Sequence, residues 1–198
     1  MESIKYYDIG LNLFCRQFRE PEIIIKDAQS NGIRCILTGT DMKENQIRCL
    51  EKHIVLAEKL GKPLFLHERS AAGDFIKRFK KHPDICHKSV VHCFTGNKQT
   101  LEQYLSMGFS IGITGWICDD RRGKELREAV HIIPLDRILV ETDAPYLTPK
   151  NVPGLDRTNV PQNIKYVVRD LAKYMKVSED ILIEHAKKNT ERIFQIEV

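Results

Sequence analysis

Three side chains that commonly bind metal ions stand where predicted strands end. They are His67 after PLFL (63–66), His92 after SVV (89–91) and Asp143 after RILVET (137–142). The carboxyl ends of parallel strands meet at one edge of an α/β sheet, and ligand sites form there. Imidazole nitrogens combined with carboxylate oxygens suit Zn²⁺, Mn²⁺ or a similar divalent ion. The spacing therefore predicts a divalent-metal site built on three strand ends.

Other polar residues occupy comparable positions and leave a plainer interpretation open. Asp8 and Asn12 lie at the end of the first predicted strand, and Glu141 lies just before Asp143. A single histidine at a strand end is more often a hydrogen-bonded structural residue, and an acidic residue there often caps the following turn. Two histidines at equivalent ends, together with an aspartate at a third, favour the metal site over this alternative.

The elements that would position these residues alternate regularly between strands and helices. Strands are expected at about 4–10, 33–39, 63–67, 89–93, 109–114 and 137–142. Helical apolar spacing lies between them, as at 45–60, 70–81 and 97–107, and two further helices follow a Pro-rich loop over 145–161. Continuous apolar strands separated by helices predict a parallel sheet covered on both faces. Residues 1–198 are expected to form a single α/β domain.

The composition is that of an ordinary globular protein and narrows the functional classes only slightly. The chain has 198 residues, 42% of them hydrophobic and 29% charged, with a formal net charge of +4. This balance neither demands nor excludes a nucleic-acid partner, because a basic groove would have to be local. The first residues lack a secretory leader pattern, and no apolar stretch approaches the roughly 20 residues of a membrane span. We therefore expect a cytoplasmic or nuclear protein without a membrane partner.

The six cysteines are scattered without a C-x-x-C pair, which predicts reduced thiols rather than a disulfide framework. Cys93 directly follows His92, so a nucleophile or a metal ligand is one interpretation of its thiol. The favoured interpretation is a small buried thiol on the opposite strand face, because successive strand residues point to opposite sides.

Five motifs, in order along nearly the whole chain, resemble the TatD family of metal-dependent deoxyribonucleases. The motifs are DIGLNL (8–13), PLFLHER (63–69), VVHCFTG (90–96), IGITGWICDDRRG (111–123) and ILVETDAPYLTP (138–149). The resemblance implies an α/β fold of the TIM-barrel (β/α)8 type that binds divalent metals. It also implies cleavage of phosphodiester bonds, often from 3′ ends of single-stranded DNA and in some members on RNA.

The resemblance also implies roles for individual residues. His67, His92 and Asp143 would be the metal ligands, with Asp143 also catalytic. Asp8 and Asn12 would lie at the floor of the site, where other members place a His-x-His pair, and Glu141 would support the ligands from behind.

Three further residues are candidates for substrate binding. Arg69 or Arg157 could meet a phosphate as a bidentate donor, with a solvated surface role as the alternative. Trp116 could stack on a base, with a packing role as the alternative.

One departure from the family lies in the segment TGTDMKENQIRCLEKHIVLAEKL (38–60). Family members carry two more strands there, one with a Gly-x-His-Pro motif and one with a Gly-Glu-x-Gly-Leu-Asp motif whose glutamate bridges the metals. We place the internal deletion near 44–47 and expect an incomplete barrel of about six parallel strands. A gapped eight-strand geometry is favoured over a closed six-stranded barrel, which would be too narrow for its interior side chains.

Two functional hypotheses follow from different classes. The first is a divalent-metal-dependent phosphodiesterase of the 3′–5′ exodeoxyribonuclease type, using Mg²⁺, Mn²⁺ or Zn²⁺, with two ions in full-length relatives and one here. Its activity would be impaired by the missing glutamate. The alternative is a catalytically inactive relative or truncated isoform that acts as a binding module. The sequence leaves the choice between DNA and RNA and the oligomeric state open.

Overall fold

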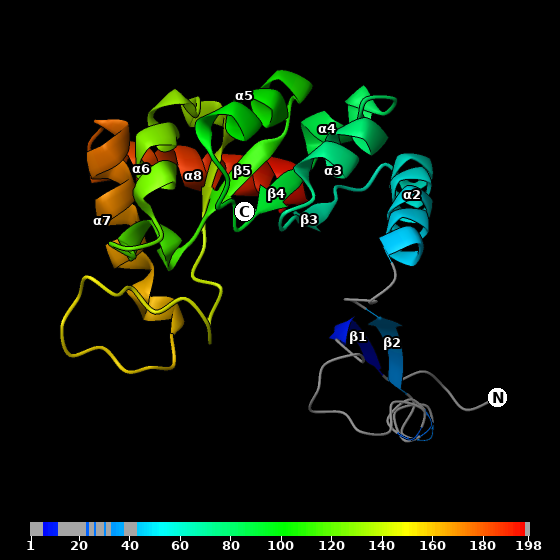
Figure 1. The fold of residues 1–198 in the computed structure, drawn as a ribbon, viewed down its shortest axis with the longest axis horizontal. Coiled ribbons are helices and arrows are strands. Elements are labelled where there is room, and N and C mark those ends of the chain that lie inside the picture. Colours follow the sequence, from blue (N-terminus) through cyan, green and yellow to red (C-terminus); the bar gives the residue numbers. More distant parts are fainter. Residues whose placement is uncertain are drawn as a thin grey trace. The chain divides into compact units, whose positions relative to one another are not determined.

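The structure is a computed structural model that describes residues 6–11, 23, 26, 30, 33–37 and 43–196. It divides into two units, Met1–His53 and Ile54–Val198, each with its own sheet. The strands of both units are drawn in Figure 1.

The first unit contains a pair of parallel strands, β1 (Tyr6–Leu11) and β2 (Ile33–Leu37). Both strands were expected from the sequence. Asp8 lies on β1, where the pairing with β2 becomes irregular before Leu11. The side chain of Asp8 and the whole of Asn12 lie outside the described residues, so their predicted supporting roles stay predictions.

The second unit contains the four strands that carry or neighbour the predicted ligands. They are β3 (Phe65–His67), β4 (Val90–His92), β5 (Ser110–Ile113) and β6 (Ile138–Val140), parallel and in that order. The register pairs His67 directly with His92. Each residue ends its strand, so both imidazoles stand at the same edge of the sheet, as the sequence predicted.

Helices connect and cover these strands. Their bounds are α2 (Lys43–Leu60), α3 (Ala72–Phe79), α4 (Pro83–Lys88), α5 (Lys98–Met107), α6 (Lys124–Ala129), α7 (Ile164–Met175) and α8 (Glu179–Phe194). Short 3-10 turns lie at Gly115–Cys118, Val130–Ile132, Leu135–Arg137 and Pro161–Asn163. The two expected C-terminal helices are thus confirmed, and the expected loop over 145–161 holds no helix before its last residue. None of the described helices is long and apolar enough to cross a membrane.

Helix α8 covers one face of the four-stranded sheet (Figure 1). Its Ile193 packs against Val90 of β4 and Leu139 of β6, and all three side chains are buried. The helix begins at a Ser178 cap, whose hydroxyl accepts a hydrogen bond from the amide of Ile181. This packing fixes β4 and β6, the strands that lead to His92 and Asp143, against a common support.

A cluster of aromatic rings packs α3 and α5 together beside β5. The cluster consists of Phe75, Phe79, Tyr104 and Phe109. Each ring that contacts another in this cluster has its centroid 4.7 to 6.1 Å from that of its neighbour. Phe79, Tyr104 and Phe109 are completely buried. Edge-to-face contacts such as that between Phe79 and Phe109, at 5.1 Å, add to the stabilisation that burial provides.

Replacing Phe109 with alanine should therefore lower the free energy of unfolding by about 3–5 kcal/mol, because a large cavity would remain in the cluster. Urea denaturation followed by circular dichroism measures this loss. Phe194→Ala is the matched control, since that ring is 38% exposed, and should cost less than half as much. Equal losses from the two variants would contradict the assignment of the core.

Candidate metal centre

His92, Cys93 and Asp143 form a compact group of potential metal ligands. One donor atom from each lies within 4.8 Å of the others. The Nε2 atom of His92 is 3.8 Å from Oδ1 of Asp143. Two residues of the predicted set, His92 and Asp143, are therefore brought together from the ends of β4 and β6.

Glu141 holds this group in place with both oxygens of its carboxylate. Oε2 lies 2.6 Å from Nδ1 of His92, and Oε1 accepts a hydrogen bond of 2.7 Å from the amide of Cys93. An ionised carboxylate only accepts hydrogen bonds, so Nδ1 of His92 must carry the hydrogen. The lone pair of the neutral ring is then on Nε2, which faces Asp143. This arrangement is the one in which a second carboxylate orients a metal-binding imidazole.

The carboxylate of Glu141 reaches His92 by crossing β5 at Gly112. β5 lies between β4 and β6 in the sheet. A Cβ atom at position 112 would lie 2.3 Å from Oε1 of Glu141 and 3.4 Å from Cα of His92. Only glycine leaves room for the carboxylate here, so the supporting contact depends on a residue that bears no chemistry itself.

The environment shifts the proton affinity of each candidate ligand. Burial lowers the pKa of His92, but the hydrogen bond and charge of Glu141 outweigh burial and raise that pKa above its ordinary value. Partial burial, and then the charge of His92, lower the pKa of His67. Burial raises the pKa of Asp143, and the negative charge of Glu141 adds to this effect although His92 opposes it. Two carboxyl groups beside two imidazoles form a site whose charges a divalent cation would balance.

Two residues of the group adopt backbone conformations that are uncommon outside glycine. Cys93 has φ of 50° and Asp143 has φ of 56°. The turn at Asp143 is held by its carbonyl, which accepts from the amide of Tyr146 at 2.8 Å. The amide side chain of the buried Asn159 donates to the carbonyls of Thr142 at 2.9 Å and Tyr146 at 2.7 Å. Such conformations persist only where the surroundings fix them, and they concentrate at functional sites.

The position of Cys93 corrects one expectation. Its side chain is buried, as predicted, but it does not point away from the site. β4 ends at His92, and the positive φ of Cys93 breaks the strand alternation on which the expectation rested. Burial raises the pKa of this thiol to about 11, and Sγ lies 3.5 Å from Oγ1 of Thr114. The Cys93 thiol is therefore protonated at neutral pH when no cation is bound.

His67 lies beside the compact group rather than within it. Its ring centroid is 5.4 Å from that of His92, and its side chain is exposed. Arg69 is also exposed, and its charge contributes to lowering the pKa of His67. His67 ends β3 and Arg69 follows it by two residues, and their predicted roles as ligand and phosphate contact stay predictions.

The other two predicted substrate-binding residues lie on loops. Arg157 is exposed, and its carbonyl accepts a hydrogen bond of 3.1 Å from the hydroxyl of Thr148. Trp116 is half-buried in the turn after β5, where its indole Nε1 donates to the carbonyl of Arg122 at 3.3 Å. Tyr146, which the sequence interpretation overlooked, is 71% exposed only three residues after Asp143.

A second buried carboxylate organises the loops that follow β5 and β6. Asp119 is 2% exposed and accepts hydrogen bonds from the amides of Arg121 at 3.0 Å and Arg122 at 3.1 Å. Its Oδ2 also accepts from Nε of Arg122 at 2.8 Å and lies 3.2 Å from Nζ of Lys150. Lys150 comes from the loop after β6, so this carboxylate ties the two loops together.

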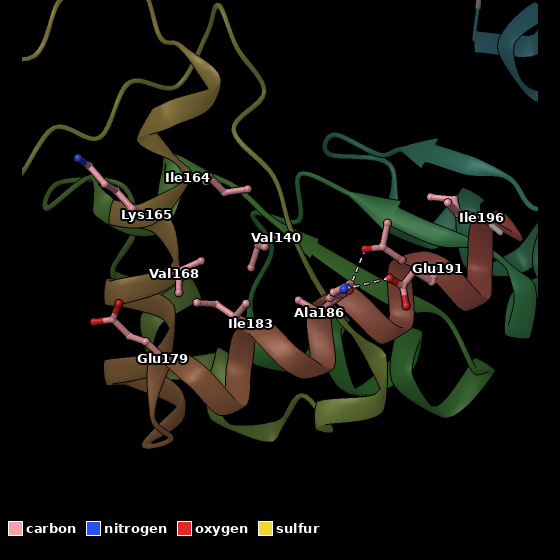
Figure 2. A pocket seen from close by; sticks show the side chains of 11 residues that line it. Val140, Ile164, Lys165, Val168, Glu179, Ile183, Ala186, Glu191 and Ile196 are labelled. Atoms are coloured by element: carbon pink, nitrogen blue, oxygen red, sulfur yellow. Dashed lines mark hydrogen bonds and ion pairs between the residues drawn. The ribbon is translucent and has the colours of Figure 1, made fainter. Parts of the chain in front are cut away.

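An apolar groove of about 580 Å³ lies apart from the candidate ligands. Figure 2 shows Ile164 and Val168 of α7, Ile183 and Ala186 of α8, and Val140 of β6 around it. None of its lining residues is one of the predicted metal ligands. The groove is therefore not the candidate metal centre.

Comparison of sequences relates the chain to a family of nucleases. The family model described as TatD related DNase matches residues 9–195. A 3′-5′ ssDNA/RNA exonuclease TatD from Pectobacterium parmentieri is 41% identical over 155 residues, which cover 77% of this chain and 60% of that protein. A protein of the same name from Rahnella sp. is 39% identical over 155 residues, covering 77% and 59%. The chain therefore spans about 60% of the length of these curated relatives.

Comparison of structures gives the same fold. The TatD homologue YJJV from Escherichia coli superimposes with a TM-score of 0.74 at 24% identity, covering 97% of this chain and 77% of that one. A TatD family hydrolase from Entamoeba histolytica gives 0.67 at 20% identity, covering 95% and 84%. The predicted α/β fold of the TIM-barrel type is thus confirmed, and the described part of the chain holds one parallel sheet of two strands and one of four.

Replacing Gly112 with alanine should displace Glu141 and weaken divalent-metal binding about 10- to 100-fold, the usual cost of losing a partner behind a ligand. Calorimetric titration with Mn²⁺ or Zn²⁺ measures the affinity. Gly73→Ala is the matched control, because a Cβ there meets nothing within 4 Å, and should bind like the unmodified protein. Unchanged affinity in Gly112→Ala would contradict the role assigned to Glu141.

Asp119 should stabilise the protein at neutral pH but not in strong acid. Burial raises the pKa of Asp119, but hydrogen bonds from Arg122 and Lys150 outweigh burial and hold that pKa well below its usual value. The stabilisation is therefore complete above the unfolded pKa of about 4 and is lost as the pH falls through the folded pKa. Asp119→Asn should lower the melting temperature at pH 7, with the difference shrinking below about pH 4. Asp120→Asn removes a carboxylate that is 80% exposed and should change the melting temperature little. A pH-independent difference for Asp119→Asn would contradict this account.

Proposed function

The chain belongs to the TatD-related DNase family, and from this premise we propose that it is a divalent-metal-dependent phosphodiesterase. We propose 3′–5′ exonuclease action on single-stranded DNA, or on RNA, because the curated relatives carry that name. The observation that carries the proposal is which nitrogen of the His92 ring carries the hydrogen. The Nδ1–H group of His92 donates to Glu141, and the unprotonated Nε2 faces Asp143.

His92 and Asp143 would hold the cation, and His67 would complete the set from the neighbouring strand end. The donor set fits a divalent ion, because neutral imidazole nitrogen and carboxylate oxygen are ligands for Zn²⁺ and Mn²⁺, and carboxylate also suits Mg²⁺. A bound ion would supply polarisation of a phosphoryl oxygen and a lower pKa for a nearby water. The predicted ligand set of this chain has only three residues, so we propose that it binds one ion.

The residues of the chain would position the reacting groups. Glu141 keeps the His92 ring in one tautomer and one orientation, and the Asn159 side chain holds the Asp143 turn. Hydrolysis forms a bond from a water oxygen to phosphorus and breaks the bond from phosphorus to O3′. One hydrogen of the water ends on the released 3′ oxygen, and the other hydrogen remains on the product phosphate.

The substrate would approach over the exposed residues near the strand ends. Arg69 stands beside His67 and can present two donors to a phosphate. Arg157 and Trp116 are proposed as further contacts from the loops after β6 and β5. We expect such an enzyme in the cytoplasm or nucleus, where nucleic acids are present.

A binding module without turnover is the second candidate. The chain spans about 60% of the length of its curated relatives. We propose that a segment is deleted near 44–47, within a single domain, and that this deletion accounts for the difference in length. The sequence lacks the glutamate motif whose carboxylate would bridge two ions. A protein with this partial site would retain nucleic-acid binding and lose most of its rate.

Removal of His92 or Asp143 should abolish nuclease activity. His92→Ala and Asp143→Asn are expected to lower the rate about 100-fold or more, because each removes a direct ligand. Release of nucleotides from 5′-labelled single-stranded DNA with Mg²⁺ or Mn²⁺ measures the rate, and a chelator should stop it. His131→Ala is the control, since that histidine is exposed outside the site. Robust chelator-sensitive cleavage that survives in His92→Ala would disprove the proposal, and binding without cleavage in the unmodified chain would favour the module.

A further inference from the structure

Two contacts hold the Arg122 side chain within its own loop, and a third holds its backbone. Its Nε donates to Oδ2 of the buried Asp119 at 2.8 Å. The guanidinium carbon lies 4.1 Å from the centre of the Trp116 ring, and the Trp116 indole donates to the Arg122 carbonyl at 3.3 Å. A guanidinium paired with a carboxylate and stacked on an indole loses much of its freedom before any ligand arrives.

The donors at the outer edge of this guanidinium are not used. Within residues 43–196, Nη1 and Nη2 of Arg122 donate to no described group, and the side chain is 44% exposed. Nε points inward to the carboxylate, so the two Nη groups form the outward side of the planar fork. This fork matches two oxygens of a phosphate.

The local charge favours an anion. Arg122 and the half-exposed Lys150 both face the single carboxylate of Asp119, and exposed Arg121 lies next to them. Asp120 is the nearby acidic residue in the loop; it is 80% exposed and lies 3.8 Å from Arg127. One buried negative charge thus balances only part of the positive charge around it.

The two loops that build this fork begin at the edge of the sheet that carries the candidate ligands. Thr114, the first residue after β5, contacts the thiol of Cys93. A Cβ at Gly115 would lie 2.1 Å from the carbonyl of Leu147, so the loops after β5 and β6 pack directly on each other. The contact between Lys150 and Asp119 joins the same two loops at a second place, farther along each loop from the sheet.

We propose that Arg122, positioned by Asp119 and Trp116 and assisted by Lys150, is an anchor for a backbone phosphate of a single-stranded nucleic acid. This inference rests on the proposed function, because it names how the same substrate would be held outside the scissile bond. The anchor provides two donors in a fixed plane and a surplus of positive charge, and neither Arg122 nor Lys150 is placed to read the edge of a particular base. It therefore binds phosphate without sequence preference.

The test measures binding separately from cleavage. A fluorescein-labelled oligothymidylate of about ten nucleotides is titrated in the presence of a chelator, and fluorescence anisotropy gives Kd at several salt concentrations. Arg122→Ala should weaken binding about 10-fold and lower the slope of log K against log salt by about 0.7. Arg122→Lys should keep the slope and still bind several-fold more weakly, because it lacks the fork.

Arg121→Ala is the matched control, since it removes the same charge from the neighbouring position, and should weaken binding less than about 2-fold. Equal effects of Arg121→Ala and Arg122→Ala, full affinity in Arg122→Lys, or no binding by the unmodified chain would overturn the anchor. Asp143→Asn separates the two proposals: it should bind the oligonucleotide normally and fail to cleave it. If the unmodified chain does not cleave but Arg122→Ala selectively loses affinity, the anchor stands and the hydrolytic function fails.

Discussion

The contact of Glu141 with His92 and Cys93 is the constraint on which the site depends. One carboxylate fixes an imidazole and a backbone amide on a strand that is not its neighbour. The contact requires that β6 end just before Glu141, that β5 carry glycine at 112, and that β4 end at His92. Three strands therefore have to keep their register for one hydrogen-bonded pair to form. The parallel sheet, with α8 packed on β4 and β6, provides that register.

Asp119 does for a cationic side chain what Glu141 does for an imidazole. Each is a carboxylate close to the end of a strand unit, and each uses both oxygens to fix its partners. The Glu141 contact leaves His92 Nε2 free, and the Asp119 contact leaves the outer donors of Arg122 free. The proposed metal-binding group and the proposed phosphate anchor therefore both begin at the carboxyl edge of the sheet. In both places, the hydrogen bonds that a carboxylate accepts within the fold also fix the side chain that would bind the ligand.

The sequence predicts the strands and the ends of the strands well, but not the contacts between distant loops. The placement of His67 and His92 at one edge of the sheet could be predicted, because each follows an apolar run that is visible in the sequence. The structure pairs the two residues in register. The turn of Cys93 toward the site was missed, since strand alternation takes no account of a positive φ directly after the strand. The Lys150 contact to Asp119 was missed because it joins two residues that are distant in the sequence and lie on separate loops. A charged residue in a loop gives no sign of the partner that tertiary structure will bring to it.

The same geometry decides how far Glu141 can compensate for the glutamate motif that this sequence lacks. A bridging carboxylate has to offer one oxygen to each of two ions. The oxygens of Glu141 lie at Nδ1 of His92 and at the amide of Cys93, whereas a cation would bind at Nε2 of the same ring, beside Asp143. Glu141 would have to leave both of its partners to reach that position. Using Glu141 as a bridge would therefore dismantle the support of the ligand it is meant to help. This conflict favours a single cation, bound by His92 and Asp143 with His67 beside them, over a two-ion centre.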